Sequence, residues 1–123
     1  MKKIIKPEAT THTIDATDRT LGRVASEAAH ALLGKRSAHF VKNAAMPITV
    51  IIENASKLHL PKKRQEGKIY THYTGYPGGL REVRMDMMIT KKGIEEVVRK
   101  TVDGMIPRNK LRKERMKRLT ITD

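Results

Sequence analysis

The chain has 123 residues and carries 26 Lys and Arg against 13 Asp and Glu, a net charge of +13. This length accommodates one domain, and so large a positive excess favours a polyanionic partner. Leu, Ile, Val and Phe together number only 27, so the expected core is small. The absence of cysteine excludes disulfide frameworks and thiol catalysis, and no apolar stretch is long enough to span a bilayer. We therefore expect an intracellular, cytoplasmic protein without membrane contact.

A basic arm is expected at the N-terminus, ahead of a single domain. Residues 1–10 are basic, contain Pro7 and show no periodicity, so a partner rather than the domain itself is expected to order them. The domain is expected over residues 11–123, and residues 13–15 are expected to close a short strand near its start.

A helix and a strand follow in the first half of the domain. Apolar residues recur with helical spacing between Thr20, a candidate N-cap, and Gly34, a candidate helix stop. These residues are Leu21, Val24, Ala25, Ala28 and Leu32. Residues 47–53 form an apolar, β-branched run, which predicts a strand covered on both faces within a parallel sheet.

The middle of the chain predicts an exposed basic segment, a strand and a turn. Five basic residues lie between Lys57 and Lys68, where Pro61 and Gly67 prevent a long helix. Residues 68–74 are β-prone, and they run into a turn over Gly75–Gly79 that neither a helix nor a strand can continue.

The C-terminal third predicts helices, a basic run and a last strand. A short helical piece is expected at 85–89, and a clearer amphipathic helix lies between Gly93 and Pro107. Residues 108–118 hold seven basic residues and one acid. If this run is helical, nearly every side of it is expected to meet phosphate. A short strand is expected over the LTIT tail.

No catalytic constellation is found. The serines lack a nucleophile-elbow pattern, and the five histidines lack metal-ligand spacing. The glycine-rich turn has neither the Walker lysine nor the GxGxxG spacing of a nucleotide-binding loop. Glu95 and Glu96 are expected to pair with the neighbouring Lys91, Lys92, Arg99 and Lys100 on one helix. We therefore expect no catalytic residue, no metal, no cofactor and no small-molecule substrate.

Nucleic acid fits the charge pattern better. The run at 108–118 has a net charge of +6, and its self-repulsion disappears on a phosphate backbone. One Phe, three Tyr and no Trp argue against an aromatic platform for single strands. Recognition of folded RNA by shape and backbone is therefore favoured. Sequence-specific DNA binding is the alternative within this class, although no convincing helix-turn-helix is present.

Four ordered motifs resemble the bacterial ribosomal protein L13 family. They are DATDRTLGRVASEAAHALLGK at 15–35, VIIENASKL at 50–58, KIYTHYTGYPGGL at 68–80 and VDGMIPRNKL at 102–111. Three departures from the family pattern lie between residues 43 and 112. NAAMPI replaces the usual turn at 43–48, Tyr73 stands where the motif histidine falls, and Arg112 occupies the usual glycine after the Asn-x-Leu motif.

The resemblance implies an α/β fold, a three-layer α/β/α arrangement with a mostly parallel four-stranded sheet, flanked by the basic N-terminal arm and the basic C-terminal segment. It also implies a structural constituent of the large ribosomal subunit that binds 23S-type rRNA, supports early assembly and adjoins other large-subunit proteins. No catalysis and no homo-oligomer are expected. The alternative is a free-standing regulator that binds mRNA or DNA.

The candidate RNA-binding residues are basic side chains and the residues of the glycine-rich turn. They are Arg19, Arg23, Lys35, Arg36, Lys62, Lys63, Arg64, Lys68, His72, Tyr73, Gly75, Tyr76, Gly78, Gly79, Arg81, Arg108, Lys110, Arg112, Lys113, Arg115, Lys117 and Arg118. In such a set the cations contact phosphate, glycines let the backbone approach an anion closely, and tyrosines stack or donate to phosphate.

Overall fold

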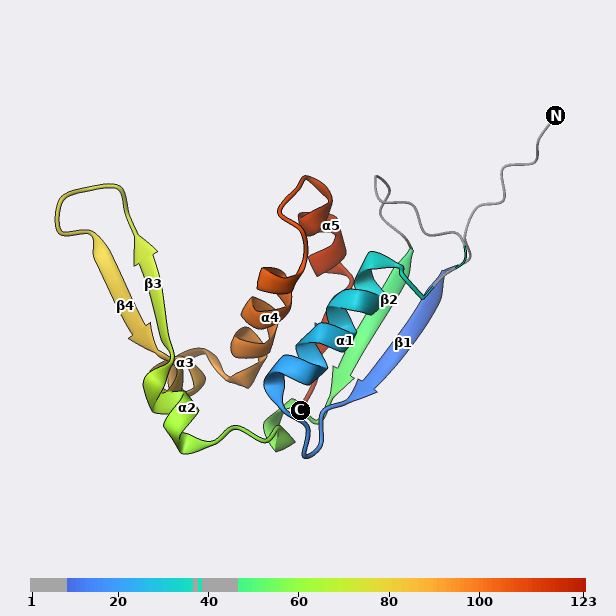
Figure 1. The fold of residues 1–123 in the computed structure, drawn as a ribbon, viewed down its shortest axis with the longest axis horizontal. Coiled ribbons are helices and arrows are strands. Elements are labelled where there is room, and N and C mark those ends of the chain that lie inside the picture. The colour runs from blue at the N-terminus through green and yellow to red at the C-terminus, as the bar shows by residue number, and fades with distance from the viewer. Residues whose placement is uncertain (1–8, 37, 39–46) are drawn as a thin grey trace.

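Three parallel strands form the main sheet, in the order β1–β2–β5. Figure 1 shows β1 and β2 side by side. The structure, a computed structural model, describes residues 9–36, 38 and 47–123. The strands of the sheet are β1 (Thr10–Asp15), β2 (Ile48–Glu53) and β5 (Leu119–Ile121). All three were expected from the sequence, and β1 ends at Asp15, where residues 13–15 were expected to close a short strand.

Helix α1 (Leu21–Leu33) connects β1 to β2 and supplies much of the core. It ends at Gly34, whose φ of 83° is left-handed and whose N–H donates to the Ala31 carbonyl oxygen. Thr20 takes the expected N-cap position with an extended backbone, although its side chain makes no capping hydrogen bond. The buried face of α1 is rich in alanine, which lets neighbouring elements approach closely. Its buried residues are Leu21, Val24, Ala25, Ala28, Ala29, Ala31 and Leu32.

The helices that contact the sheet lie on one side of it. α4 (Ile94–Met105) packs against α1 and β5, and α5 (Leu111–Lys117) contacts α1 and β5. The α4 helix lies where Gly93 and Pro107 were expected to bracket it, and it buries Val97, Val98 and Val102. These side chains and the buried face of α1 form one continuous core with the sheet.

The opposite face of the sheet is largely polar, and none of the described helices covers it. In β2, Ile48, Val50 and Ile52 are buried, whereas Thr49 and Ile51 between them are only half-buried. Thr11, Thr13, Glu53 and Thr120 are exposed. The expectation that β2 is covered on both faces is therefore wrong for the described residues. They form a mostly parallel α/β arrangement of two layers with three strands in the sheet.

A hydrogen-bonded turn joins β1 to α1 and holds the ends of β1 and β2 together. The Asp15 carboxylate accepts hydrogen bonds from the Thr17 N–H at 3.0 Å, the Thr17 hydroxyl at 2.7 Å and the Asn54 side-chain amide at 3.0 Å. These bonds lower the pKa of Asp15 to about 2. The turn fixes the direction in which α1 leaves the sheet.

A separate antiparallel hairpin projects from the body of the protein, at the left of Figure 1. It consists of β3 (Ile69–Tyr73) and β4 (Leu80–Arg84), and helical segments flank it in the chain. These segments are the 3₁₀ turn η1 (Ala55–Lys57), α2 (Lys62–Gly67) and α3 (Met85–Lys92). The sequence predicted β3 but missed β4, because β4 has only two apolar residues and no buried side chain to mark it.

The last helices differ from their expected bounds. α3 extends to Lys92, beyond the short piece expected at 85–89, and α5 occupies only Leu111–Lys117 of the basic run. Within the described ranges, no helix is long and apolar enough to cross a membrane. Residues 43–46 and most of the N-terminal arm lie outside the described residues, while Thr10 already belongs to β1.

Candidate nucleic-acid interface

The tip of the hairpin is shaped by its glycines. Gly75 and Gly78 have φ values of 91° and 74°, which side chains other than glycine rarely adopt. The Thr74 N–H donates to the Gly79 carbonyl at 3.1 Å, and the Gly79 N–H donates to the Tyr76 carbonyl at 2.9 Å. A Cβ atom on Gly79 would clash with the Thr74 hydroxyl and would lie 2.9 Å from the Tyr76 carbonyl oxygen, so this close approach requires glycine.

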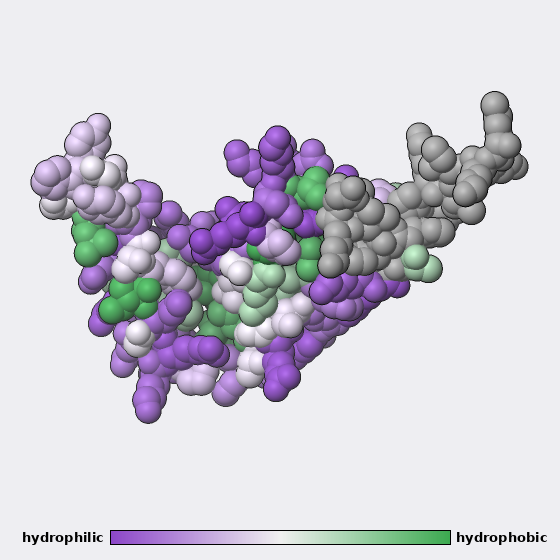
Figure 2. Space-filling view, turned by 45° about the horizontal axis from the view of Figure 1, so that its top comes forward, coloured by the Kyte–Doolittle hydropathy of each residue, from purple (hydrophilic) through white to green (hydrophobic). Residues whose placement is uncertain are grey.

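The hairpin exposes large apolar and aromatic side chains. Tyr76 at the tip is 75% exposed, Tyr73 is 61% exposed and Leu80 is 59% exposed. Tyr73 and Leu80 face each other across the strands, as do His72 and Arg81. Figure 2 shows apolar patches on this projecting part, bordered by hydrophilic side chains. The structure therefore brings together the predicted residues His72, Tyr73, Gly75, Tyr76, Gly78, Gly79 and Arg81 on one exposed element.

Helix α2 places basic side chains beside the base of the hairpin. Lys62, Lys63, Arg64 and the following Lys68 are all exposed, and α2 buries no residue. Within the described part of the chain, none of the four forms an ion pair with a carboxylate. The segment is exposed and basic, as the sequence predicted, and its charge is available to a polyanion.

Tyr70 connects this region to α4. The Lys68 and Lys100 ammonium nitrogens lie 5.6 Å and 5.4 Å from the centre of the Tyr70 ring, within cation–π range. Burial raises the pKa of the Tyr70 hydroxyl, and the positive charge of Arg64 opposes that shift. Lys100 was absent from the predicted site, because its helical spacing from Glu96 suggested an ion pair.

That expected pairing on α4 is not found. Among the described residues, neither Glu95 nor Glu96 forms an ion pair with Lys91, Lys92, Arg99 or Lys100. Both glutamates lie in the first turn of α4, where negative charge is favourable to the helix dipole. Surface ion pairs of this kind contribute little to folding stability, so other interactions decide where the lysine side chains lie.

Helix α5 and the loop before it are basic on one side only. Arg108, Lys110, Lys113 and Lys117 are exposed. Arg112 is half-buried, and its Nε lies 3.4 Å from a carboxylate oxygen of Asp103 on α4. The Asn109 side chain accepts a hydrogen bond from the Leu111 N–H at 3.0 Å, which supports the start of the helix.

Arg115 is the exception within α5, because only 2% of it is exposed. Its Nε has no hydrogen-bond partner among the described residues, and neither has a buried terminal nitrogen of the half-buried Arg118. Burial lowers the pKa of the Arg115 guanidinium. The expectation that nearly every side of this run meets phosphate is therefore wrong, since one side of α5 faces the protein.

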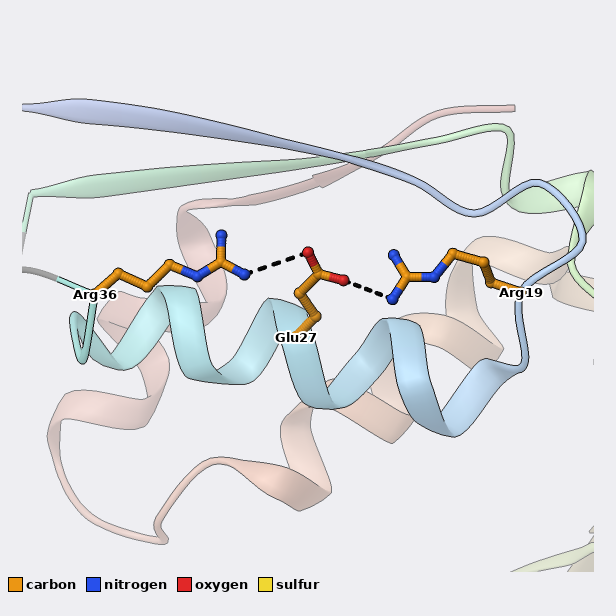
Figure 3. Close-up of polar contacts among 3 residues, drawn as sticks. All are labelled: Arg19, Glu27 and Arg36. Atoms are coloured by element: carbon orange, nitrogen blue, oxygen red, sulfur yellow. Dashed lines mark hydrogen bonds and ion pairs between the residues drawn. The ribbon is translucent and has the colours of Figure 1, made fainter.

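Two more predicted residues flank α1 and share one acid. Arg19 lies before the helix and Arg36 after it, and their guanidinium groups contact Glu27 at 2.6 Å and 3.2 Å (Figure 3). These cations hold the pKa of Glu27 below its ordinary value. The three side chains keep one net positive charge, and the predicted Arg23 and Lys35 near them are exposed.

The fold and this surface define a small α/β protein that presents cations, tyrosines and a glycine-rich turn to a partner. Within the ranges that the structure describes, no group of three or more His, Cys, Asp and Glu side chains is arranged to hold a metal ion.

Comparison with known proteins assigns the chain to a family. The model of the family "Ribosomal protein L13" matches residues 9–122, so the chain belongs to this family. It is 36% identical over 122 residues to the large ribosomal subunit protein uL13 of Geobacter sulfurreducens, covering 97% of this chain and 85% of that protein. The uL13 proteins of Chlamydia abortus and Thermus thermophilus are 41% and 40% identical, covering 89% and 88% of this chain and 73% and 76% of their own lengths. The chain is thus a ribosomal protein, a structural component and not an enzyme.

Proposed function

We propose that the hairpin, α2 and α5 bind large-subunit rRNA by neutralising its phosphates. As a member of its family, the chain is a structural constituent of the large ribosomal subunit and part of the translation machinery in the cytoplasm. The observation that carries the proposal is the concentration of exposed cations around a projecting hairpin that buries none of its own side chains. Folded RNA offers both phosphate for these cations and base faces for the tyrosines.

The three surfaces have different tasks in this proposal. The hairpin tip brings backbone N–H groups and two tyrosines close to the RNA, since its glycines leave no side chain in the way. The cations of α2 and the exposed cations at 108–117 contact phosphate. Arg19, Arg23, Lys35 and Arg36 form a further basic surface at the ends of α1, where Glu27 weakens the charge.

Some finer features of the proposal concern parts beyond the described surfaces. We propose that the arm that precedes β1 also binds rRNA, that the protein joins the subunit early in assembly, and that it contacts neighbouring ribosomal proteins as a single copy without forming homo-oligomers. The fourth strand and third layer implied by the family resemblance stay predictions for this chain, as does a single domain over 11–123.

The experiment is binding of the full chain to large-subunit rRNA from its own source, measured by filter binding over a series of salt concentrations. We expect the logarithm of affinity to fall linearly with the logarithm of salt, with a slope of about −0.7 to −0.9 for each phosphate contact. Small-subunit rRNA and a DNA duplex serve as the comparison ligands. Equal affinity for all three ligands would overturn the proposal, and preference for the DNA would favour a free-standing regulator.

A further inference from the structure

A basic pocket lies between the base of the hairpin and the helices. Its volume is about 320 Å³, and its walls come from α1, α2, β3, α3 and α4. Tyr70 on β3 is half-buried in the wall, with Met85 and Met105 among the apolar lining. In Figure 2, apolar side chains lie in the space between the hairpin and the helical body, and hydrophilic side chains surround them.

The charged groups of the pocket are all positive. Arg64, Lys68 and Lys100 line it, and none of the acidic side chains in residues 9–36, 38 and 47–123 does. Two of the three ammonium and guanidinium groups already lie over the ring of Tyr70. The same face of the hairpin continues away from the pocket with the His72–Arg81 pair, because side chains two residues apart share a strand face. A chain of phosphates can therefore run from the pocket along the hairpin.

We propose that this pocket receives one unstacked nucleotide of the bound RNA. The base lies against Tyr70 and the two methionines, and its flanking phosphates bind Arg64, Lys68 and Lys100. The proposal rests on the proposed function and adds a specific element to it, because a fully paired helix offers phosphates but no free base face. The volume is at the lower end of the range for small-molecule pockets, about 300–1,000 Å³, which suits a single nucleotide.

A nucleotide needs the aromatic ring and the apolar methionines for its base and the cations for its phosphates. A base is flat and apolar on its faces, and any of the four bases can stack on an aromatic ring. The ammonium groups of the exposed Lys68 and Lys100 are on flexible stems, so they can leave the ring for a phosphate when a base arrives. An isolated nucleotide carries the same ring and phosphate, but it lacks the flanking phosphates that would reach Arg81.

The experiment compares two RNA duplexes that differ by one bulged adenosine, each titrated with the full chain and followed by fluorescence anisotropy. We expect the wild-type protein to prefer the bulged duplex by roughly 5- to 100-fold, the range of a single base stack. AMP is the third ligand, and it should bind more weakly than the bulged duplex. The variants Tyr70→Ala and Lys100→Gln should each reduce the preference, and Tyr70→Phe should retain it.

Tyr76→Ala is the matched control, because this tyrosine lies at the hairpin tip and does not line the pocket. It should weaken both duplexes equally and leave the preference unchanged. Equal binding of the two duplexes by the wild type overturns the pocket proposal alone, whereas failure to bind large-subunit rRNA overturns the proposed function. AMP binding as tight as the bulged duplex would assign the pocket to a free nucleotide instead. Lys100 is exposed, so Lys100→Gln gives a result even if Tyr70→Ala does not fold.

Discussion

The three-stranded sheet with α1 and α4 buries its apolar side chains, whereas the β3–β4 hairpin exposes most of its own. Val50 in the central strand and Val98 on α4 have no exposed surface, while Tyr73 and Leu80 on the hairpin are 61% and 59% exposed. Both regions are built from short elements with regular hydrogen bonding. They differ in what lies against their side chains.

Because of this difference, the sheet region stabilises the fold and the hairpin is left available for binding. Burial of apolar surface stabilises the sheet region, at about 25 cal/mol for each Å² removed from water. An isolated two-stranded hairpin is marginally stable at best in water. The packing of Tyr70 and Val83 at its base anchors the hairpin to the core, and the exposed remainder is available to a partner.

Truncation of one leucine in each region is the most direct test of this difference. Leu32 on α1 is 1% exposed, and Leu32→Ala should lower the free energy of unfolding by about 2–5 kcal/mol because it leaves a cavity. The matched variant Leu80→Ala should change it by less than about 0.5 kcal/mol. Urea denaturation of the free protein measures both. Similar losses for the two variants would show that the hairpin is part of the folded core.

The second prediction concerns the charge of α2. Replacing Lys62, Lys63 and Arg64 together by alanine should flatten the salt dependence of rRNA binding by about 2 to 3 units of slope, since each phosphate contact contributes about 0.7 to 0.9. The unfolding free energy should stay nearly unchanged, because these side chains are exposed. A variant with Lys57, Lys91 and Lys92 replaced loses the same charge elsewhere. If both triple variants have the same slope, α2 is not a specific contact surface.

The third prediction tests Arg115, a buried residue that was predicted from the sequence to bind RNA with the other basic residues at 108–118. Arg115→Met should raise the free energy of unfolding by about 1 kcal/mol, because it removes a buried nitrogen that has no partner among the described residues and keeps the apolar volume. The rRNA affinity should be unchanged, in contrast to Lys113→Met on the exposed side of α5. Thermal unfolding and filter binding measure the two effects. A loss of affinity with Arg115→Met would return this residue to the RNA-binding set.

The smallest effect is expected at the acid between Arg19 and Arg36. The folded pKa of Glu27 is below its ordinary value of 4.5, so its stabilising effect is complete above pH 4.5 and is lost as the pH falls through the folded pKa. Glu27→Gln should lower stability at pH 7 by less than about 1 kcal/mol, since all three side chains are partly exposed. It should also reduce the loss of melting temperature in acid. Melting curves from pH 7 to pH 3 provide the measurement, and identical curves would assign no role to these ion pairs.

Elements with a strong apolar period could be predicted from the sequence. The helical spacing from Leu21 to Leu32 and the β-branched run at 48–53 are confirmed as α1 and β2. The glycine-rich turn was recognised from composition, and the structure adds the strand β4 that closes it. β4 escaped prediction because its charged residues show no apolar alternation, and pairing with β3 decides its conformation.

The candidate surface was predicted in part for a similar reason. Exposed cations next to each other in sequence, as in α2, form a cluster whatever the tertiary structure. Lys100 lies 30 or more residues from Lys68 and Arg64, and only the packing of α4 beside the hairpin brings it to Tyr70. Sequence spacing instead suggested a local ion pair that the fold does not form.

The residues alone were enough to predict the charge, the absence of cysteine chemistry, the main periodic elements and, through four motifs, the family. These properties depend on residue type and on spacing along the chain. Tertiary structure decided which side of the sheet the helices cover, which of the seven basic residues at 108–118 is buried, and which distant cations share a pocket with Tyr70. Those outcomes depend on contacts between segments far apart in the chain, and the burial of a basic side chain such as Arg115 leaves no apolar pattern in the sequence.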